Sequence, residues 1–308
     1  MNPGNVRPAH VTLYEVGPRD GLQAETEIVA TADKIALIDR LSASGLKYIE
    51  ATSFVSKKWV PQMADAAEVM AGITQRTSAT YPVLTPNLQG YEAARDAGAQ
   101  TVAIFGAASE TFSLKNINCS IAESLARFRF VMGEAAINAM PVRGYVSTVI
   151  ACPYEGAIKP QAVTDMAARM LDMGCYEISL GDTIGVGTPA DVERLLDVIL
   201  KVIPAEKLAV HFHDTYGQAL ANILTALDHG IATIDSSVGG LGGCPYAPGA
   251  SGNVATEDVL YMLNGLGIET GVDLETIVAT AWQISDVLGR PPRSKVAVAK
   301  QPPRNDAR

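Results

Sequence analysis

Residues 208–230 read LAVHFHDTYGQALANILTALDHG and hold one strand followed by one helix. The apolar run Leu208–His213 predicts a buried strand, because short continuous apolar runs are typical of parallel sheets. The amphipathic run Gln218–His229 predicts a helix that packs one face on that strand. Gly230 follows directly, at the position past a helix end where a positive φ is often needed. A strand with a crossover helix is the building unit of parallel α/β folds.

The same unit is repeated along most of the chain. Strands are expected at His10–Glu15, Lys47–Phe54, Ser78–Leu84, Thr101–Gly106, Val142–Ile150, Tyr176–Leu180, Leu208–His213 and Thr233–Val238. The helices that follow them are expected at Thr31–Ser44, Pro61–Ile73, Leu88–Ala97, Ile117–Met140, Pro160–Met173, Pro189–Ile203, Gln218–His229 and Thr256–Leu266. Eight such units in about 260 residues is the count of a (β/α)8 TIM barrel. A doubly wound open α/β sheet has the same periodicity and is the alternative.

A further helix is expected after the eighth unit, over Glu269–Gly289. We therefore expect a catalytic barrel domain over residues 1–270, an additional C-terminal helix over 271–290 that packs on the barrel, and a flexible tail over 291–308. Residues 290–308 carry a net charge of +5, against −14 for the rest of the chain. Such a charge run is typical of a solvated segment.

The composition limits the classes of function. The chain has 308 residues, 48% of them hydrophobic and 19% charged, so it can bury a large core and is not a disordered protein. A net charge of −9 argues against a nucleic-acid partner, because phosphate binding needs clustered Lys and Arg. Four cysteines without CxxC spacing argue against a disulfide framework or a zinc ribbon. We expect no membrane partner and a cytoplasmic protein, because neither a long apolar run nor a targeting pattern is present.

Polar residues interrupt the predicted strands near their carboxyl ends, where the active site of a barrel lies. Buried charge is unfavourable unless it is paired or bound to a ligand, so this convergence indicates a site. The residues concerned are Glu15–Gly21, Glu50–Ser53, Arg143, Tyr145, Gly181–Thr183, His211–Asp214 and Gly239–Cys244.

His211 and His213 are two of the four histidines and lie two positions apart on one predicted strand. Alternation along a strand places both imidazoles on the same face, where they can chelate a metal. In a barrel, Asp20 from the first strand end lies near the seventh strand, and Asn253 after the eighth can add an amide oxygen. This mixed set suits an octahedral divalent ion such as Mg²⁺ or Mn²⁺, without excluding zinc or iron. A pair of hydrogen-bonded core histidines is the simpler alternative.

The segment from Gly239 to Gly252 contains six glycines in fourteen residues and one cysteine, Cys244. A loop this rich in glycine can approach a ligand closely and can move. A free cysteine is more often a small buried apolar residue. Because Cys244 lies among glycines rather than in an apolar run, its thiol is a candidate to give or take a proton.

Five segments carry a family resemblance. They are EVGPRDGLQ at Glu15–Gln23, EATSFVSKKWVPQM at Glu50–Met63, EISLGDTIGVGTP at Glu177–Pro189, HFHDTYGQ at His211–Gln218 and VGGLGGCPYAPGASGN at Val238–Asn253. Together they closely resemble the hydroxymethylglutaryl-CoA lyase family, over about residues 10–290. The resemblance implies a TIM barrel of the pyruvate carboxyltransferase type with a Mg²⁺ or Mn²⁺ cofactor. The implied enzyme cleaves (S)-3-hydroxy-3-methylglutaryl-CoA to acetyl-CoA and acetoacetate, as in leucine degradation and ketone body metabolism.

The resemblance also implies residue roles. The metal-ligand places fall on Asp20, His211, His213 and Asn253, and the catalytic places fall on Arg19, Cys244, Asp20, His211, Glu50 and Asp182. Substrate contacts are expected from Arg19, Gln23, Ser53, Arg143, Tyr145 and Thr183. The implied reaction is a retro-Claisen cleavage in which Asp20 or His211 removes the hydroxyl proton, Arg19 stabilises the enolate oxygen and Cys244 protonates the carbon. The expected partners are an acyl-CoA substrate and further copies of the chain, a dimer first.

Three other functions stay open on the sequence. Thr148 and Ala151 stand where many relatives have Cys and Gly, which allows a lyase for a related substrate of the citramalyl-CoA type. A Claisen-condensing acyltransferase of the isopropylmalate or homocitrate synthase type would share Arg19, Asp20 and the histidine pair. A binding module without activity is the third alternative, although the ligands, the arginine and the cysteine are all present.

Overall fold

The structure is a computed structural model that describes residues 7–243 and 252–301. Its centre is a sheet of nine strands in the order β2-β1-β11-β10-β9-β6-β5-β4-β3, in which every pair is parallel. The strands are β1 (Thr12–Glu15), β2 (Tyr48–Ile49), β3 (Thr52–Ser53), β4 (Val83–Leu84), β5 (Val102–Ala107), β6 (Val142–Ser147), β9 (Ile178–Asp182), β10 (Leu208–Phe212) and β11 (Thr233–Ser236). A small antiparallel pair, β7 (Ala151–Cys152) and β8 (Gly156–Ala157), lies outside this sheet.

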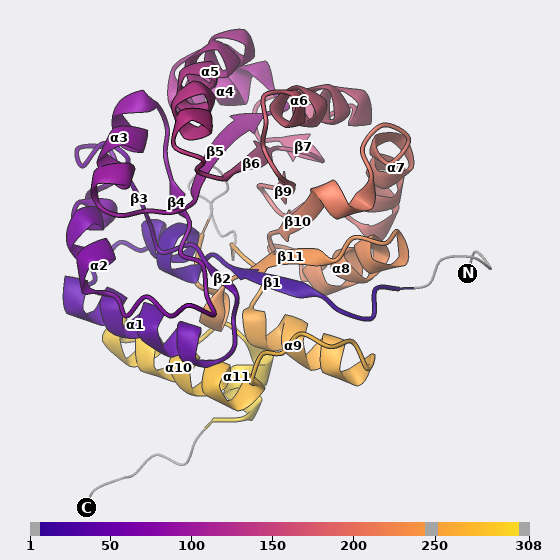
Figure 1. Ribbon diagram of the computed structural model, residues 1–308. Helices are drawn as coiled ribbons and strands as arrows, with labels where there is room; N and C mark the ends of the chain where they lie inside the picture. The colour runs from indigo at the N-terminus through magenta and orange to yellow at the C-terminus, as the bar shows by residue number, and fades with distance from the viewer. Residues whose placement is uncertain (1–6, 244–251, 302–308) are drawn as a thin grey trace, which may run out of the picture.

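The sheet closes on itself because its two end strands belong to one chain segment (Figure 1). Only Glu50 and Ala51 separate β2 from β3. The Glu50 amide donates to the Glu15 carbonyl at 2.8 Å on one side, and the Ala51 amide donates to the Pro82 carbonyl at 2.9 Å on the other. The predicted TIM barrel is therefore confirmed over the open sheet, with Lys47–Phe54 as one interrupted strand.

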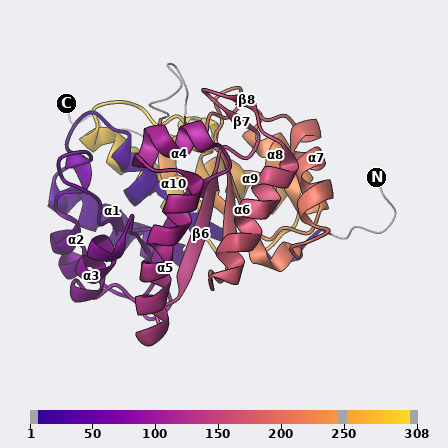
Figure 2. The ribbon, with the colours of Figure 1, turned by 90° about the horizontal axis from the view of Figure 1, so that it is seen from above.

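Helices surround the barrel on the outside (Figures 1 and 2). They are α1 (Thr31–Ala43), α2 (Ala66–Gly72), α3 (Leu88–Asp96), α4 (Glu110–Ile117), α5 (Ile121–Ile137), α6 (Pro160–Asp172), α7 (Pro189–Ile199), α8 (Ala219–Asp228) and α9 (Thr256–Gly265). The additional C-terminal helix is α10 (Leu274–Val287), and it packs beside α1 and α9. Within the described residues, none of these helices is long and apolar enough to cross a membrane.

Two helix ends show how local sequence sets the elements. α7 begins at Pro189, and the Thr188 amide and hydroxyl both donate to the Asp191 carboxylate, at 2.9 and 2.6 Å. This arrangement satisfies groups that the first helical turn leaves unpaired. α1 is followed by Gly45, whose φ is +97°, and a Cβ there would lie 2.3 Å from the Gly271 carbonyl oxygen. Only glycine fits this turn.

The start of the helix predicted over Ile117–Met140 is wrong, because Ile117 is the last residue of α4 and α5 begins only at Ile121. Asn118 adopts a left-handed conformation with φ +51°, which ends α4. Ser120 then starts α5: its amide donates to the Glu123 carboxylate at 2.8 Å, and the Glu123 amide donates to Ser120 Oγ at 3.2 Å. The Ser-x-x-Glu pattern is a helix-start signal that the apolar periodicity of the surrounding residues obscures.

The structure differs from the expected flexible tail over residues 291–301. A short helix, α11 (Lys295–Ala299), packs against α9 and α10 there. The Trp282 indole donates to the Ala297 carbonyl at 2.8 Å, and the Ser294 hydroxyl donates to the Asp258 carboxylate at 2.8 Å. The charge composition did not predict this ordered segment, because two specific side chains, Trp282 and Ser294, hold it in place. Residues 302–308 lie outside the described residues.

Candidate active site

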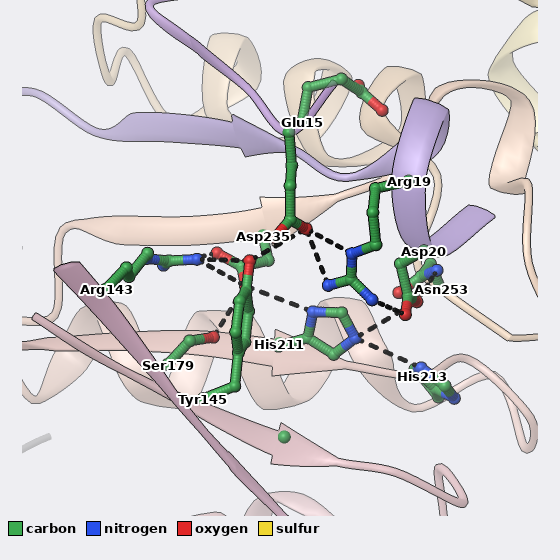
Figure 3. Close-up of polar contacts among 12 residues, drawn as sticks. Glu15, Arg19, Asp20, Arg143, Tyr145, Ser179, His211, His213, Asp235 and Asn253 are labelled. Carbon is green, nitrogen blue, oxygen red and sulfur yellow. Dashed lines mark hydrogen bonds and ion pairs between the residues drawn. The ribbon is translucent and has the colours of Figure 1, made fainter. Parts of the chain in front are cut away.

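The predicted metal ligands lie at the carboxyl ends of neighbouring strands (Figure 3). Asp20 lies in a π-helical turn, η1 (Gly17–Gly21), directly after β1. His211 and His213 lie at the end of β10, which reaches β1 through β11. Asn253 forms an isolated antiparallel bridge with His213. The barrel thus brings these four residues to one place.

The four residues form one cluster of donor atoms. One ligand atom from each of Asp20, His211 and His213 lies within 4.8 Å of the others. The two Nε2 atoms are 3.3 Å apart, and His211 Nε2 is 3.8 Å from Asp20 Oδ2. The Asn253 amide donates to Asp20 Oδ2 at 2.8 Å. Burial lowers the pKa of His213 to about 4, so this imidazole is neutral at pH 7 and can bind a metal.

Arg19 is a buried cation between two carboxylates. Its Nε donates to Glu50 Oε2 at 2.7 Å and its Nη1 donates to Asp20 Oδ1 at 2.6 Å, while the guanidinium lies 5.4 Å from the centre of the Tyr145 ring. Burial would lower the pKa of Arg19, but the two carboxylates outweigh burial and raise that pKa above its usual value. Arg19 therefore presents a fixed positive charge directly beside the histidines.

Arg143 does not lie where a substrate could reach it. Its side chain has no exposed surface, and it donates to Glu177, Tyr145 and Asp235 at distances between 2.8 and 3.1 Å. The structure therefore does not support the predicted substrate contact of Arg143, because every polar group of Arg143 faces another protein side chain. Tyr145, in contrast, lies between Arg143 and Glu50, and its hydroxyl donates to Glu50 Oε2 at 3.2 Å.

The other expected site residues divide into two groups. Gln23 is half-buried, Ser53 is fully buried, and the Gln23 Oε1 and Ser53 Oγ atoms make no hydrogen bond within the described part of the chain. Asp182 and Thr183 instead hold loops, since Asp182 accepts from the Gly187 amide and Thr183 Oγ1 accepts from the Thr148 amide, both at 2.8 Å. The expected catalytic Cys244 lies outside the described residues.

Two further buried carboxylates, Glu15 and Glu257, accept hydrogen bonds from backbone amides of the segments that follow β1 and β11. Glu15 Oε1 accepts from the Gly17 amide at 2.8 Å and from the Val238 amide at 2.9 Å, which ties the Asp20 turn to the start of the glycine-rich loop. Glu257 accepts from the Gly239 amide at 2.8 Å. Burial raises the pKa of Glu15 to about 7 and that of Glu257 to about 8.

We expect the stability of Glu257→Gln to depend less on pH than that of the wild type. Glu257 has a higher pKa in the folded protein than its usual 4.5, so its contribution to stability is complete below about pH 4.5 and is lost as the pH rises to about 8. The glutamine side chain carries no such proton, and the loss in unfolding free energy between pH 5 and 8 should shrink by roughly 3 kcal/mol. Urea titrations of both proteins at several pH values measure the unfolding free energy.

Glu193→Gln is the matched control for this experiment, because Glu193 is exposed on α7. It should keep the wild-type pH dependence. An unchanged pH dependence in Glu257→Gln would show that Glu257 is ionised in the folded protein throughout this range.

Sequence reasoning missed Asp235, which contacts His211, and Ser179, which contacts Asp235. Asp235 Oδ2 lies 3.2 Å from His211 Nδ1, and the Ser179 hydroxyl donates to the same oxygen at 2.7 Å. Burial would raise the pKa of Asp235, but Arg143 and His211 lower it to about 2. The available signal was a carboxylate in the middle of a predicted buried strand, which is unfavourable unless it has a partner.

Comparison with known proteins gives one family. A family model described as HMGL-like matches residues 10–284. The mitochondrial hydroxymethylglutaryl-CoA lyase of Arabidopsis thaliana is 61% identical over 95% of this chain, which spans 62% of that protein's length. The cytoplasmic 3-hydroxy-3-methylglutaryl-CoA lyase of Mus musculus is also 61% identical over 95% of this chain and 85% of its own length.

Solved structures agree with this family. The hydroxymethylglutaryl-CoA lyase of Pseudomonas aeruginosa superposes with a TM-score of 0.94 at 58% identity, over 95% of this chain and 98% of that chain. An HMG-CoA lyase of Acinetobacter baumannii in complex with coenzyme A and 3-methylmalate gives a TM-score of 0.91 at 37% identity, over 100% of this chain and 99% of that chain. On its sequence and its fold, the chain belongs to the HMGL-like family.

Proposed function

We propose that this protein cleaves (S)-3-hydroxy-3-methylglutaryl-CoA to acetyl-CoA and acetoacetate with the help of Mg²⁺ or Mn²⁺. The observation that carries the proposal is the contact between a fixed cation and a chelating cluster: Arg19 Nη1 lies 2.6 Å from Asp20, which itself lies beside His211 and His213. The names of the relatives support the same substrate, and the complex of the Acinetobacter protein with coenzyme A supports an acyl-CoA ligand.

The donor set fits a hard or borderline divalent ion. Asp20 offers carboxylate oxygen, His211 and His213 offer imidazole nitrogen, and Asn253 can offer its amide oxygen from the same edge of the cluster. These four ligands would leave positions for oxygen atoms of a substrate. A bound divalent ion supplies charge that lowers the pKa of a coordinated hydroxyl group.

Protein side chains accept the hydroxyl proton of the substrate and stabilise the negative charge of the enolate. The tertiary hydroxyl proton passes to the Asp20 carboxylate, and the C2–C3 bond breaks to leave the ketone of acetoacetate. The electron pair moves onto the thioester oxygen, where Arg19 stabilises the enolate. We assign the return of a proton to C2 to the Cys244 thiol, as the family resemblance implies.

A substrate panel tests this function. We expect 3-hydroxy-3-methylglutaryl-CoA with Mn²⁺ or Mg²⁺ to give acetyl-CoA and acetoacetate in equal amounts, and EDTA to lower the rate by more than about 100-fold until metal is restored. Faster turnover of citramalyl-CoA would favour the related lyase. Condensation of acetyl-CoA with a 2-oxo acid would favour the acyltransferase. Full activity after complete removal of metal would contradict the proposed chemistry.

Thr148, which stands where many relatives have Cys, gives little support to a lyase of the citramalyl-CoA type. Thr148 is fully buried, and its hydroxyl donates to the Ser147 carbonyl at 2.6 Å. The residue thus offers no free polar group to a substrate. The relatives carry both mitochondrial and cytoplasmic names, so these names do not favour the expected cytoplasmic location.

A further inference from the structure

A buried ionic network lies beside the cluster of donor atoms and ends on His211 (Figure 3). Asp235 has almost no contact with solvent and accepts at both oxygens: Oδ1 from Arg143 Nη2 at 2.8 Å, and Oδ2 from Arg143 Nη1 at 3.1 Å. Oδ2 also accepts from Ser179 and lies 3.2 Å from His211 Nδ1. The mechanism proposed above uses neither Asp235 nor Arg143.

We propose that Asp235, held by Arg143, is a positioning residue that fixes His211 with its proton on Nδ1 and its Nε2 lone pair toward the metal cluster. This inference rests on the proposed metal site. An ionised carboxylate can only accept hydrogen bonds, so a neutral His211 must place its single ring proton on the side that faces Asp235. His211 Nε2, which faces His213 and Asp20, is then free of a proton and can act as a ligand.

The contacts of Arg143 hold the Asp235 carboxylate in one orientation. Arg143 contacts it through two parallel N–H groups, which is the strongest arrangement of this ion pair. The same guanidinium lies 3.8 Å from the centre of the Tyr14 ring and donates through Nε to Glu177 at 2.8 Å. Since these partners lie on or beside strands β1, β6 and β9, the carboxylate can neither turn nor move away from His211.

Asp235→Asn tests the inference, because it keeps the shape and removes the charge. Arg143 Nη2 needs an acceptor at the Oδ1 position, whereas Arg143 Nη1 also donates to Tyr145 and the Ser179 hydroxyl can turn to accept. The oxygen of the new amide therefore takes the Oδ1 position, and its NH₂ group faces His211. We therefore expect the His211 proton to move to Nε2 and the Kd for Mn²⁺, measured by electron paramagnetic resonance, to rise about 10- to 100-fold. The chain has only four histidines, so ¹⁵N NMR of the metal-free protein can report the His211 tautomer directly.

Two further variants separate this role from simple packing. Glu177→Gln removes the other carboxylate partner of Arg143 without touching His211, and it should leave the Kd for Mn²⁺ within about twofold of wild type. Ser179→Ala removes one donor to Asp235 while keeping its charge, and it should keep the Nδ1–H tautomer. If Asp235→Asn does not fold, the tautomer of the wild-type protein decides the question by itself.

The outcomes are distinct. An Nε2–H tautomer in the wild-type protein, or unchanged Mn²⁺ affinity and tautomer in Asp235→Asn, would overturn the inference and leave the proposed lyase function intact. Equal weakening of Mn²⁺ binding by Glu177→Gln and Asp235→Asn would overturn it too, by showing a packing effect. Failure of the wild-type protein to bind Mn²⁺ would instead overturn the proposed metal centre.

Discussion

Arg19→Met should lower kcat by about 1,000-fold or more while Mn²⁺ binding is kept. A single donor to a developing oxyanion is worth about 100- to 1,000-fold in kcat, and Arg19 adds a full charge in a buried site. Metal affinity should not fall, since Arg19 competes with a cation for Asp20 and supplies no ligand atom. Steady-state kinetics and Mn²⁺ binding by electron paramagnetic resonance measure the two quantities.

Arg19→Met should also destabilise the fold, so the loss of kcat must be separated from the loss of stability. Glu50 is fully buried and would lose the cation that is hydrogen-bonded to it, a loss that costs about 3 kcal/mol or more. The double variant Arg19→Met with Glu50→Gln removes the unpaired charge, so it should recover stability, while kcat stays low because Glu50 is itself an expected catalytic residue. Recovery of kcat in the double variant would show that Arg19 acts only on stability. Loss of Mn²⁺ binding in Arg19→Met would count against the oxyanion role.

His213→Ala should abolish activity by removing the metal. The proposed metal site has two imidazole ligands, and loss of one should weaken Mn²⁺ binding by at least about 100-fold, to the level of chelator-treated enzyme. Isothermal titration with Mn²⁺ and the lyase assay measure this. His229→Ala is the matched control, because His229 lies at the end of α8, where its Nδ1 contacts the Thr225 carbonyl at 2.8 Å. Equal metal content in both variants would contradict the ligand assignment.

Much of the fold could be predicted because each βα unit is encoded locally. Apolar runs and helix-start residues such as Thr188 and Pro189 act within a few residues of each other, so periodicity finds them. The errors lie where a single residue overrides periodicity. Asn118 in a left-handed conformation ends α4, so α5 begins later than the predicted helix, and Ser294 anchors a segment whose charge predicts a solvated tail.

The candidate site shows the same division. His211 and His213 could be predicted to share a face, because alternation along a strand is a local rule. The family resemblance added the catalytic role of Arg19 and supported Asp20 and Asn253 as ligands. The sequence did not separate Arg143, which the structure buries completely, from Tyr145, which lies beside Glu50.

By itself, the sequence determined the repeated units, the location of the site at the strand ends, and the chemistry of its donors. These properties depend on residue type and on spacing along the chain. Only the tertiary structure decided that Lys47–Phe54 closes the ring, that Glu15 ties the Asp20 turn to the glycine-rich loop, and that Asp235 contacts His211. Such contacts join residues far apart along the chain, and strand register sets them, which no local pattern encodes.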